Sequence, residues 1–152
     1  MKILEGLLTI NGVDPYVAYG AFLAFGKGED PLKNYSALLT PPEVKEPRKV
    51  SYRERDGVKY PSKIIQRWKE REVTLKFGIV APDKTTFEER FYGFINFLKD
   101  GVDGWLEVKV VELSRTFRMR LVRPSNYEQL TDFDGEVAAM FDVTFEEPEP
   151  NF

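Results

Sequence analysis

The amino-acid sequence predicts a mainly β protein, an antiparallel β-sandwich or barrel flanked by a single α-helix. Four segments after residue 71 alternate apolar with polar residues, which is the period of a strand with one buried face. One amphipathic segment between the first and second of these has helical spacing. With 152 residues and 42% hydrophobic residues, the chain fits a single domain over residues 1–152. We expect core strands over residues 2–25 and 71–148.

Two strands are expected near the N-terminus. The apolar stretch of residues 2–10 ends at Asn11-Gly12, a pair suited to a tight turn. Residues 16–25 alternate small with aromatic side chains, which favours a short second strand.

Residues 26–70 are predicted to form a long loop and a protruding arm. Residues 26–48 have no sustained period and contain four prolines, so they indicate an irregular connection. Residues 49–71 are the most polar segment, with basic and acidic side chains mixed. We interpret them as a polar hairpin arm with Asp56-Gly57 near its turn.

The strand that follows the arm carries Val73, Leu75, Phe77 and Ile79 on one face, and Pro82 ends it. The predicted helix covers about residues 86–100.

Thr85 or Thr86 is the expected cap of this helix, because Glu88 and Glu89 each follow a Thr by three residues. Its apolar face should pack on the sheet and consists of Phe87, Phe91, Phe94, Ile95 and Leu98.

Three more strands are expected after Gly101 and Gly104, which end the helix. Their buried faces begin with Leu106, Phe117 and Val137, and the last strand runs through Phe145. Pro124 is expected to close the middle one, and a loop separates it from the last.

The composition argues against several kinds of chemistry. The chain has no His and no Cys, so serine triads lack their usual base and thiolate metal sites are absent. We expect no enzyme, no catalytic residue, no cofactor, no metal and no small-molecule ligand. The balance of 22 Lys and Arg against 25 Asp and Glu gives no basic surface for sequence-specific nucleic acid. No stretch of about 20 apolar residues predicts a membrane span, and no signal peptide is visible, so the protein should be made in the cytoplasm.

Some acidic pairs leave a hydrolase hypothesis open. Asp132 with Asp134, or Glu146 with Glu147, have the residue types of an acid and base pair in glycoside cleavage. The first pair lies beside Gly135 in a predicted loop, and the second ends a strand, where an exposed edge is the simpler interpretation. The segment 100–104 is rich in Asp and Gly but lacks the pattern of a calcium loop, so we interpret it as a turn.

Arg118 and Arg120 share one face of a predicted strand. Contact with phosphate is conceivable for such a row, but pairing with carboxylates on a neighbouring strand is the simpler interpretation.

Apolar side chains in the polar arm are the best candidates for an interface. They are Tyr52, Tyr60, Ile64, Ile65 and Trp68. Aromatic residues in such a place stack on sugars or are buried against a neighbouring subunit, and the sequence leaves both options open.

Three segments resemble the N-terminal domain of phage distal tail proteins, a group related to tail tube and contractile-injection tube proteins. They are Ile10-Asn11-Gly12-Val13-Asp14, the strand of residues 71–77 that leads to a helix, and residues 141–145 followed by Glu-Pro. The family's second, C-terminal domain has no counterpart in these 152 residues, which agrees with a minimal form, a tube-like protein or a different member.

The resemblance implies a β-sandwich or barrel with one helix, assembled with itself as a hexameric ring around a tail channel. Residues 49–69 and 26–48 would then bridge subunits or stacked rings. Our first hypothesis is therefore a structural phage or prophage tail component, located in the virion tail, that self-associates and docks other tail proteins. The alternative is a carbohydrate-binding or adhesin-type module that uses Tyr52, Tyr60 and Trp68.

Overall fold

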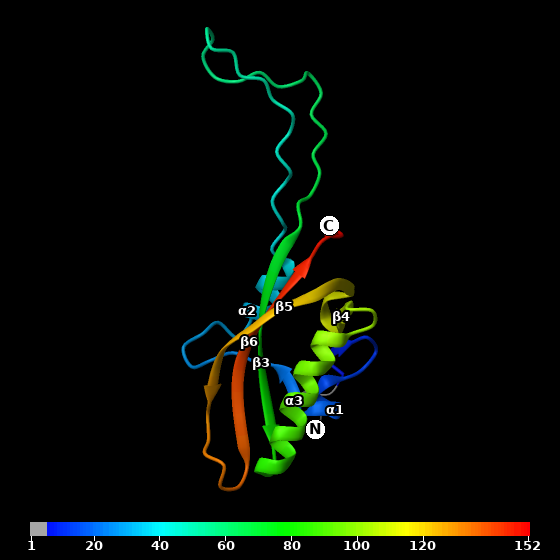
Figure 1. The fold of residues 1–152 in the computed structure, drawn as a ribbon, viewed down its shortest axis with the longest axis vertical. Helices are drawn as coiled ribbons and strands as arrows, with labels where there is room; N and C mark the ends of the chain where they lie inside the picture. Colours follow the sequence, from blue (N-terminus) through cyan, green and yellow to red (C-terminus); the bar gives the residue numbers. More distant parts are fainter. Residues whose placement is uncertain (1–5) are drawn as a thin grey trace.

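The structure is a computed structural model that describes residues 6–152, and it consists of one antiparallel sheet, a long helix and a protruding arm (Figure 1). The strands are β1 (Leu8–Ile10), β2 (Ala21–Leu23), β3 (Arg71–Ala81), β4 (Leu106–Val110), β5 (Arg115–Gln129) and β6 (Val137–Glu147). The helices are α1 (Pro15–Tyr19), α2 (Lys33–Leu39) and α3 (Lys84–Asp100), with a 3-10 turn η1 (Val111–Leu113).

The sheet has six strands in the order β1-β4-β5-β6-β3-β2, and every neighbouring pair is antiparallel. It curves into a nearly closed barrel. Its two edge strands face each other across a cavity of about 130 Å³, which Leu8 of β1 and Ala21 of β2 both line. The predicted class, a mainly β sandwich or barrel with a flanking helix, is confirmed.

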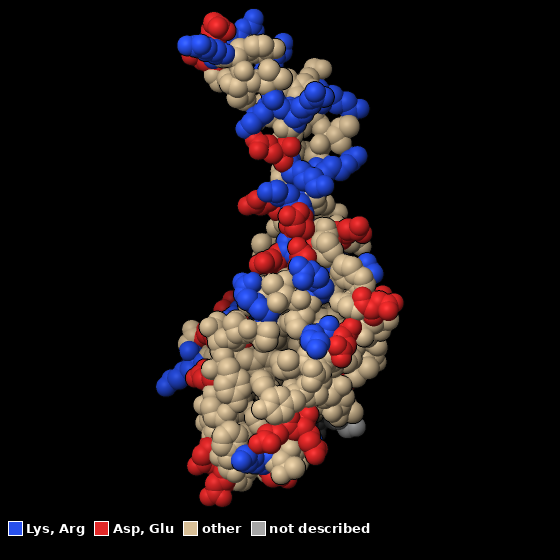
Figure 2. All heavy atoms as spheres, in the orientation of Figure 1, with Lys and Arg blue, Asp and Glu red and all other residues tan. Residues whose placement is uncertain are grey.

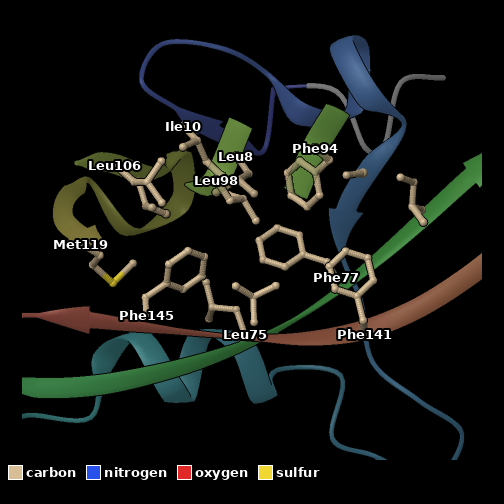
Figure 3. Packing of buried hydrophobic residues seen from close by; sticks show 14 of the residues in the cluster. Leu8, Ile10, Leu75, Phe77, Phe94, Leu98, Leu106, Met119, Phe141 and Phe145 are labelled. Carbon is tan, nitrogen blue, oxygen red and sulfur yellow. The ribbon is translucent and has the colours of Figure 1, made fainter. Parts of the chain in front are cut away.

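Alternation along β3 and β6 builds the centre of the core. Leu75 and Phe77 of β3 and Phe141 and Phe145 of β6 are almost fully buried. Figure 3 shows these side chains on the inner face with Phe94 of α3, whose ring lies 5.3 Å from that of Phe77, centroid to centroid. The period-two pattern therefore identified the buried face of both strands correctly.

The long helix α3 packs its predicted face on the sheet but begins earlier than expected. Asp83 is the cap, and its carboxylate accepts a 2.8 Å hydrogen bond from the backbone N–H of Thr86. This bond lowers the pKa of Asp83. Predicting Thr85 or Thr86 as the cap was wrong because Asp83 follows Pro82 directly and satisfies the first turn itself. Gly101 ends the helix, where a Cβ would lie 2.4 Å from the Trp105 carbonyl oxygen.

The N-terminal prediction was half right. Residues 16–25 contain β2, but α1 precedes it, because Asp14 accepts a 3.0 Å hydrogen bond from the N–H of Tyr16 and Pro15 suits a first helical turn. Within the described residues the first strand is β1, and residues 2–5 of the predicted strand lie outside them. Asn11 and Gly12 have φ angles of 53° and 78°, as a tight turn requires.

Pro124 does not end its strand, contrary to the prediction. β5 continues to Gln129 beside β6, with breaks in register between Leu121 and Arg123 and between Ser125 and Glu128. Such irregularities accommodate a residue that has no N–H to donate.

Residues 26–48 are irregular, as their prolines indicated, except for α2, which the sequence analysis did not predict. This helix packs on β3 through Asn34 and Leu38, both buried. Asn34 accepts a 2.8 Å hydrogen bond from the N–H of Lys76 and donates one of 2.9 Å to the Ala24 carbonyl oxygen. The Asn34 side chain therefore holds the segment on the body through hydrogen bonds to backbone atoms, as a neighbouring strand would.

A buried ion pair joins β3 to β6 where the arm begins. Nε of Arg71 lies 2.7 Å from a carboxylate oxygen of Glu147, and their side chains are 7% and 2% exposed. Arg71 also donates to the Thr40 carbonyl oxygen at 2.6 Å. The prediction of an exposed edge was wrong for Glu147 because its register partner in β3 is Arg71. Glu146 pairs with Arg120 at 2.7 Å, as the cross-strand interpretation of that arginine required.

We expect Glu147→Ala to lower the free energy of unfolding by about 3–5 kcal/mol, because it leaves the Arg71 charge buried without its partner. Urea unfolding measures this change. Glu146→Ala is the matched control: it removes a more exposed pair on the adjacent residue and should cost about 0.2–1 kcal/mol. Equal losses for the two variants would contradict this account.

Candidate assembly interface

Residues 43–70, which we name the arm, extend from the body as two extended segments that lie side by side (Figure 1). Near the base, Lys45 N–H donates to the Arg67 carbonyl at 2.7 Å and Lys69 N–H donates to the Glu43 carbonyl at the same distance. Farther out, Val50 and Lys59 exchange hydrogen bonds of 2.8 and 2.6 Å. The arm is thus a loosely paired hairpin, and the predicted turn contains Gly57, with a φ of 72°.

The arm has no core of its own. Every residue from 48 to 70 is exposed, and a two-stranded hairpin without a packed face is marginally stable in water. Apolar side chains are nevertheless frequent on it. Those at least 40% exposed are Val44, Val50, Tyr52, Val58, Tyr60, Ile64, Ile65 and Trp68. Exposed apolar surface of this extent is typical of an interaction site.

All five residues singled out from the sequence lie on this exposed arm, but they do not converge on one point. Trp68 lies at the base, where its ring is 6.2 Å from that of Phe152. Tyr52 lies near the tip, beneath the guanidinium of Arg55 at 5.6 Å. Such a distribution suits contact along an extended protein surface better than one compact sugar platform. The sequence analysis did not single out Val44, Val50 and Val58, although each is an apolar residue in a charged segment.

The arm and the rest of the chain carry opposite charge. Residues 43–70 contain nine Lys or Arg and five Asp or Glu, a net charge of +4. The other residues contain 13 Lys or Arg and 20 Asp or Glu, a net charge of −7. Figure 2 shows Lys and Arg along the arm and mostly Asp and Glu at the opposite end of the molecule. The near balance of the whole sequence conceals this separation.

A second surface feature is an aromatic groove, which we define by Phe87, Phe91, Tyr92, Tyr127 and Phe133. It has a volume of about 590 Å³, and Phe141 lies at its buried side. The Phe91 ring lies 5.5 Å from those of Tyr127 and Phe141. Sequence reasoning placed Phe87 and Phe91 on the core face of the helix and missed the groove.

The groove could not be predicted from the sequence because its side chains come from three separate elements, α3, β5 and the loop before β6. Its exposed aromatics follow no common period, and Tyr92 lies beside the predicted core face of the helix.

Glu29 fastens the segment between β2 and α2 to β3. Its carboxylate accepts a 2.6 Å hydrogen bond from Gly26 N–H, contacts Nζ of Lys76 at 2.8 Å and pairs with Lys33. These hydrogen bonds lower the pKa of Glu29 to about 2, and the one from Lys33 has the largest effect. A Cβ at Gly26 would lie 2.3 Å from that carboxylate, so a larger residue there would displace the Glu29 side chain from this position.

The remaining acidic and basic candidates form ordinary local structure. Asp132 accepts a 3.0 Å hydrogen bond from Asp134 N–H within an exposed loop, and Gly104 N–H donates to the Asp100 carbonyl in a turn. The Arg118 guanidinium lies 4.0 Å above the Trp105 ring. Within residues 6–152, no three acidic side chains are grouped as metal ligands would be. No helix in that range has both the length and the hydropathy to cross a bilayer.

Comparisons with known proteins find a likeness at the level of the fold. No family model matches the sequence. No curated protein matches it either. Among solved structures, the chain is similar to the crystal structure of the SPP1 Dit protein, described as a paradigm of the hub adsorption apparatus in phages that infect Gram-positive bacteria.

The TM-score with that structure is 0.55 and the sequence identity is 15%. The match covers 91% of this chain and 48% of the other, so this chain spans about half the length of the structure it resembles. Because the sequence identity is this low, the match supports a shared fold alone. The fold predicted from the resemblance to distal tail proteins therefore agrees with a solved phage protein.

Glu29 is expected to make stability depend on acid pH. Its pKa of about 2 in the folded protein lies below the ordinary 4.5, so its contribution is complete above pH 4.5 and is lost as the pH falls towards 2. The difference in unfolding free energy between the wild type and Glu29→Gln should be constant near neutral pH and should shrink between pH 4.5 and 2. Urea unfolding at several pH values, with an NMR titration of the Glu29 carboxyl, measures both quantities. A midpoint near 4.5 in the folded protein would contradict the assignment.

Proposed function

We propose that this protein is a structural, non-enzymatic component of a phage or prophage tail, and that its arm joins it to further copies of itself. The observation that carries the proposal is the arm: an extended, coreless hairpin with eight exposed apolar side chains. The similarity of the body to the SPP1 Dit protein, a hub adsorption protein of phages, supports the tail assignment.

The energetics favour a contact made by many residues of the arm at once. Association costs about 4–15 kcal/mol in lost translational and rotational freedom, and one fully buried Ile side chain contributes about 1.5–3 kcal/mol. One inserted residue is therefore insufficient. Ile64, Ile65 and Trp68, together with the other exposed apolar residues of the arm, supply enough surface if the arm lies along a neighbouring subunit.

The proposed assembly is a ring. The arm and the body are different surfaces, so a contact between them is heterologous and propagates from copy to copy until it closes. Six subunits is the number that the resemblance to distal tail proteins implies, and other tail proteins would dock on the faces of the ring.

Shortening the arm should abolish self-association and leave the fold intact. Replacing residues 47–65 by a short Gly-Ser turn keeps the bridge between Val44 and Trp68 and removes most of the exposed apolar surface. The variant should stay monomeric in light scattering across a concentration series in which the wild type forms larger species. Its circular dichroism should still show the sheet and helix.

Val17→Ser is the matched control, because it removes a 67% exposed apolar side chain from the body. It should assemble as the wild type does. A wild type that is monomeric at every concentration, with rings absent in negative-stain images, would refute the proposal.

A further inference from the structure

The aromatic groove is open to solvent at the end of the body far from the arm. Tyr92, Tyr127 and Phe133 line it and are 61%, 47% and 48% exposed, although each ring packs against another. Partial burial raises the pKa of the Tyr127 hydroxyl. Large aromatic side chains that are left uncovered are typical anchors of interfaces.

The loop that contributes Phe133 to the groove is acidic, although the ammonium of Lys84 lies 5.7 Å from the centre of the Phe133 ring. Residues 128–136 contain four Asp or Glu and no Lys or Arg, and Phe133 lies within them. Glu88 of α3 also lines the groove, with Lys84 at 3.9 Å from its carboxylate. Figure 2 shows red side chains gathered at this end of the molecule. The excess of acidic over basic residues favours an occupant that brings apolar side chains together with positive charge.

One segment of the arm has this chemistry. Residues 59–68 contain Lys59, Lys63 and Arg67 and no acidic residue, and Ile64 and Ile65 lie between these charges with 42% and 60% exposure. The segment is extended and makes few backbone hydrogen bonds of its own, so it is available for docking.

We propose that the aromatic groove of one copy binds residues 59–68 of the arm of a second copy. The inference rests on the proposed self-association and names the surface that receives the arm. Ile64 and Ile65 enter the groove between α3 and β5, and the basic side chains of the segment lie against the acidic residues 128–136. The arm and the groove lie at opposite ends of the body, so each copy gives its arm to one neighbour and receives an arm from another.

Cross-linking between single cysteines tests this contact, because the chain contains no cysteine. Ile65→Cys marks the arm, and Ser125→Cys marks the groove with a substitution of similar size. The two proteins, one of them isotopically labelled, are mixed at a concentration where the wild type is assembled and treated with a short bismaleimide. A product that contains one copy of each is expected, identified by mass. Thr116→Cys, exposed on the same strand, is the control and should give less than about a tenth of that product.

A charge exchange provides a second readout. Asp132→Lys with Asp134→Lys should weaken association at least about tenfold, and combining this pair with Lys59→Glu and Lys63→Glu should restore it. Both acidic residues are exposed, so the fold should survive.

The outcomes separate this inference from the proposed function. A protein that assembles but gives no more Ile65–Ser125 product than the Thr116 control refutes the groove as the receiving surface and leaves self-association intact. A protein that never assembles refutes both. Failure of the charge exchange to restore association, with the cross-link present, refutes the proposed charge pairing.

Discussion

The pairing of β3 with β6 determines where every other part of the molecule lies. Eleven residue pairs join the two strands, from Arg71 with Glu147 at one end to Ala81 with Val137 at the other. The arm enters β3 at the first end, and α3 and the loop before β6 flank the second. The length of this pair therefore separates the arm from the groove.

The same pairing explains why a coreless arm and a well-packed body coexist in one chain. Phe77, Phe141 and Phe145 form a continuous aromatic contact under the pair, so the body does not depend on the arm for its core. At the boundary, the buried Arg71–Glu147 pair holds the two strands together next to the point where the arm departs. Fluctuations of the arm, which has few hydrogen bonds, therefore need not open the sheet.

The sequence predicted the elements whose side chains repeat with a clear period. β3, β6 and α3 each have one buried face, and this produces alternation or helical spacing that is visible without coordinates. α1 and α2 span only five and seven residues, too few for a period, and their stability comes from contacts with distant residues. Asn34 of α2 illustrates this, since its amide bonds to the backbone of β3 and nothing local indicates that role.

Part of the candidate interface was equally visible and part was not. The arm could be predicted because apolar residues such as Ile65 and Trp68 are conspicuous in a charged segment. The groove could not, since Tyr92, Tyr127 and Phe133 meet only after β5 continues past Pro124 and its hairpin with β6 folds beside α3. Tertiary contacts between elements distant in the chain leave no local signal.

The separation of charge bears on which copies of the protein meet and how. At physiological ionic strength, exposed charges act over about 8 Å, so the charges of +4 on the arm and −7 elsewhere contribute mainly at close approach. Two arms placed together repel each other, and so do two acidic ends, whereas an arm against an acidic end is attracted. Charge thus disfavours a symmetric dimer through either end and favours head-to-tail contact. Affinity then comes from the apolar side chains, and the charges select which surfaces are brought together.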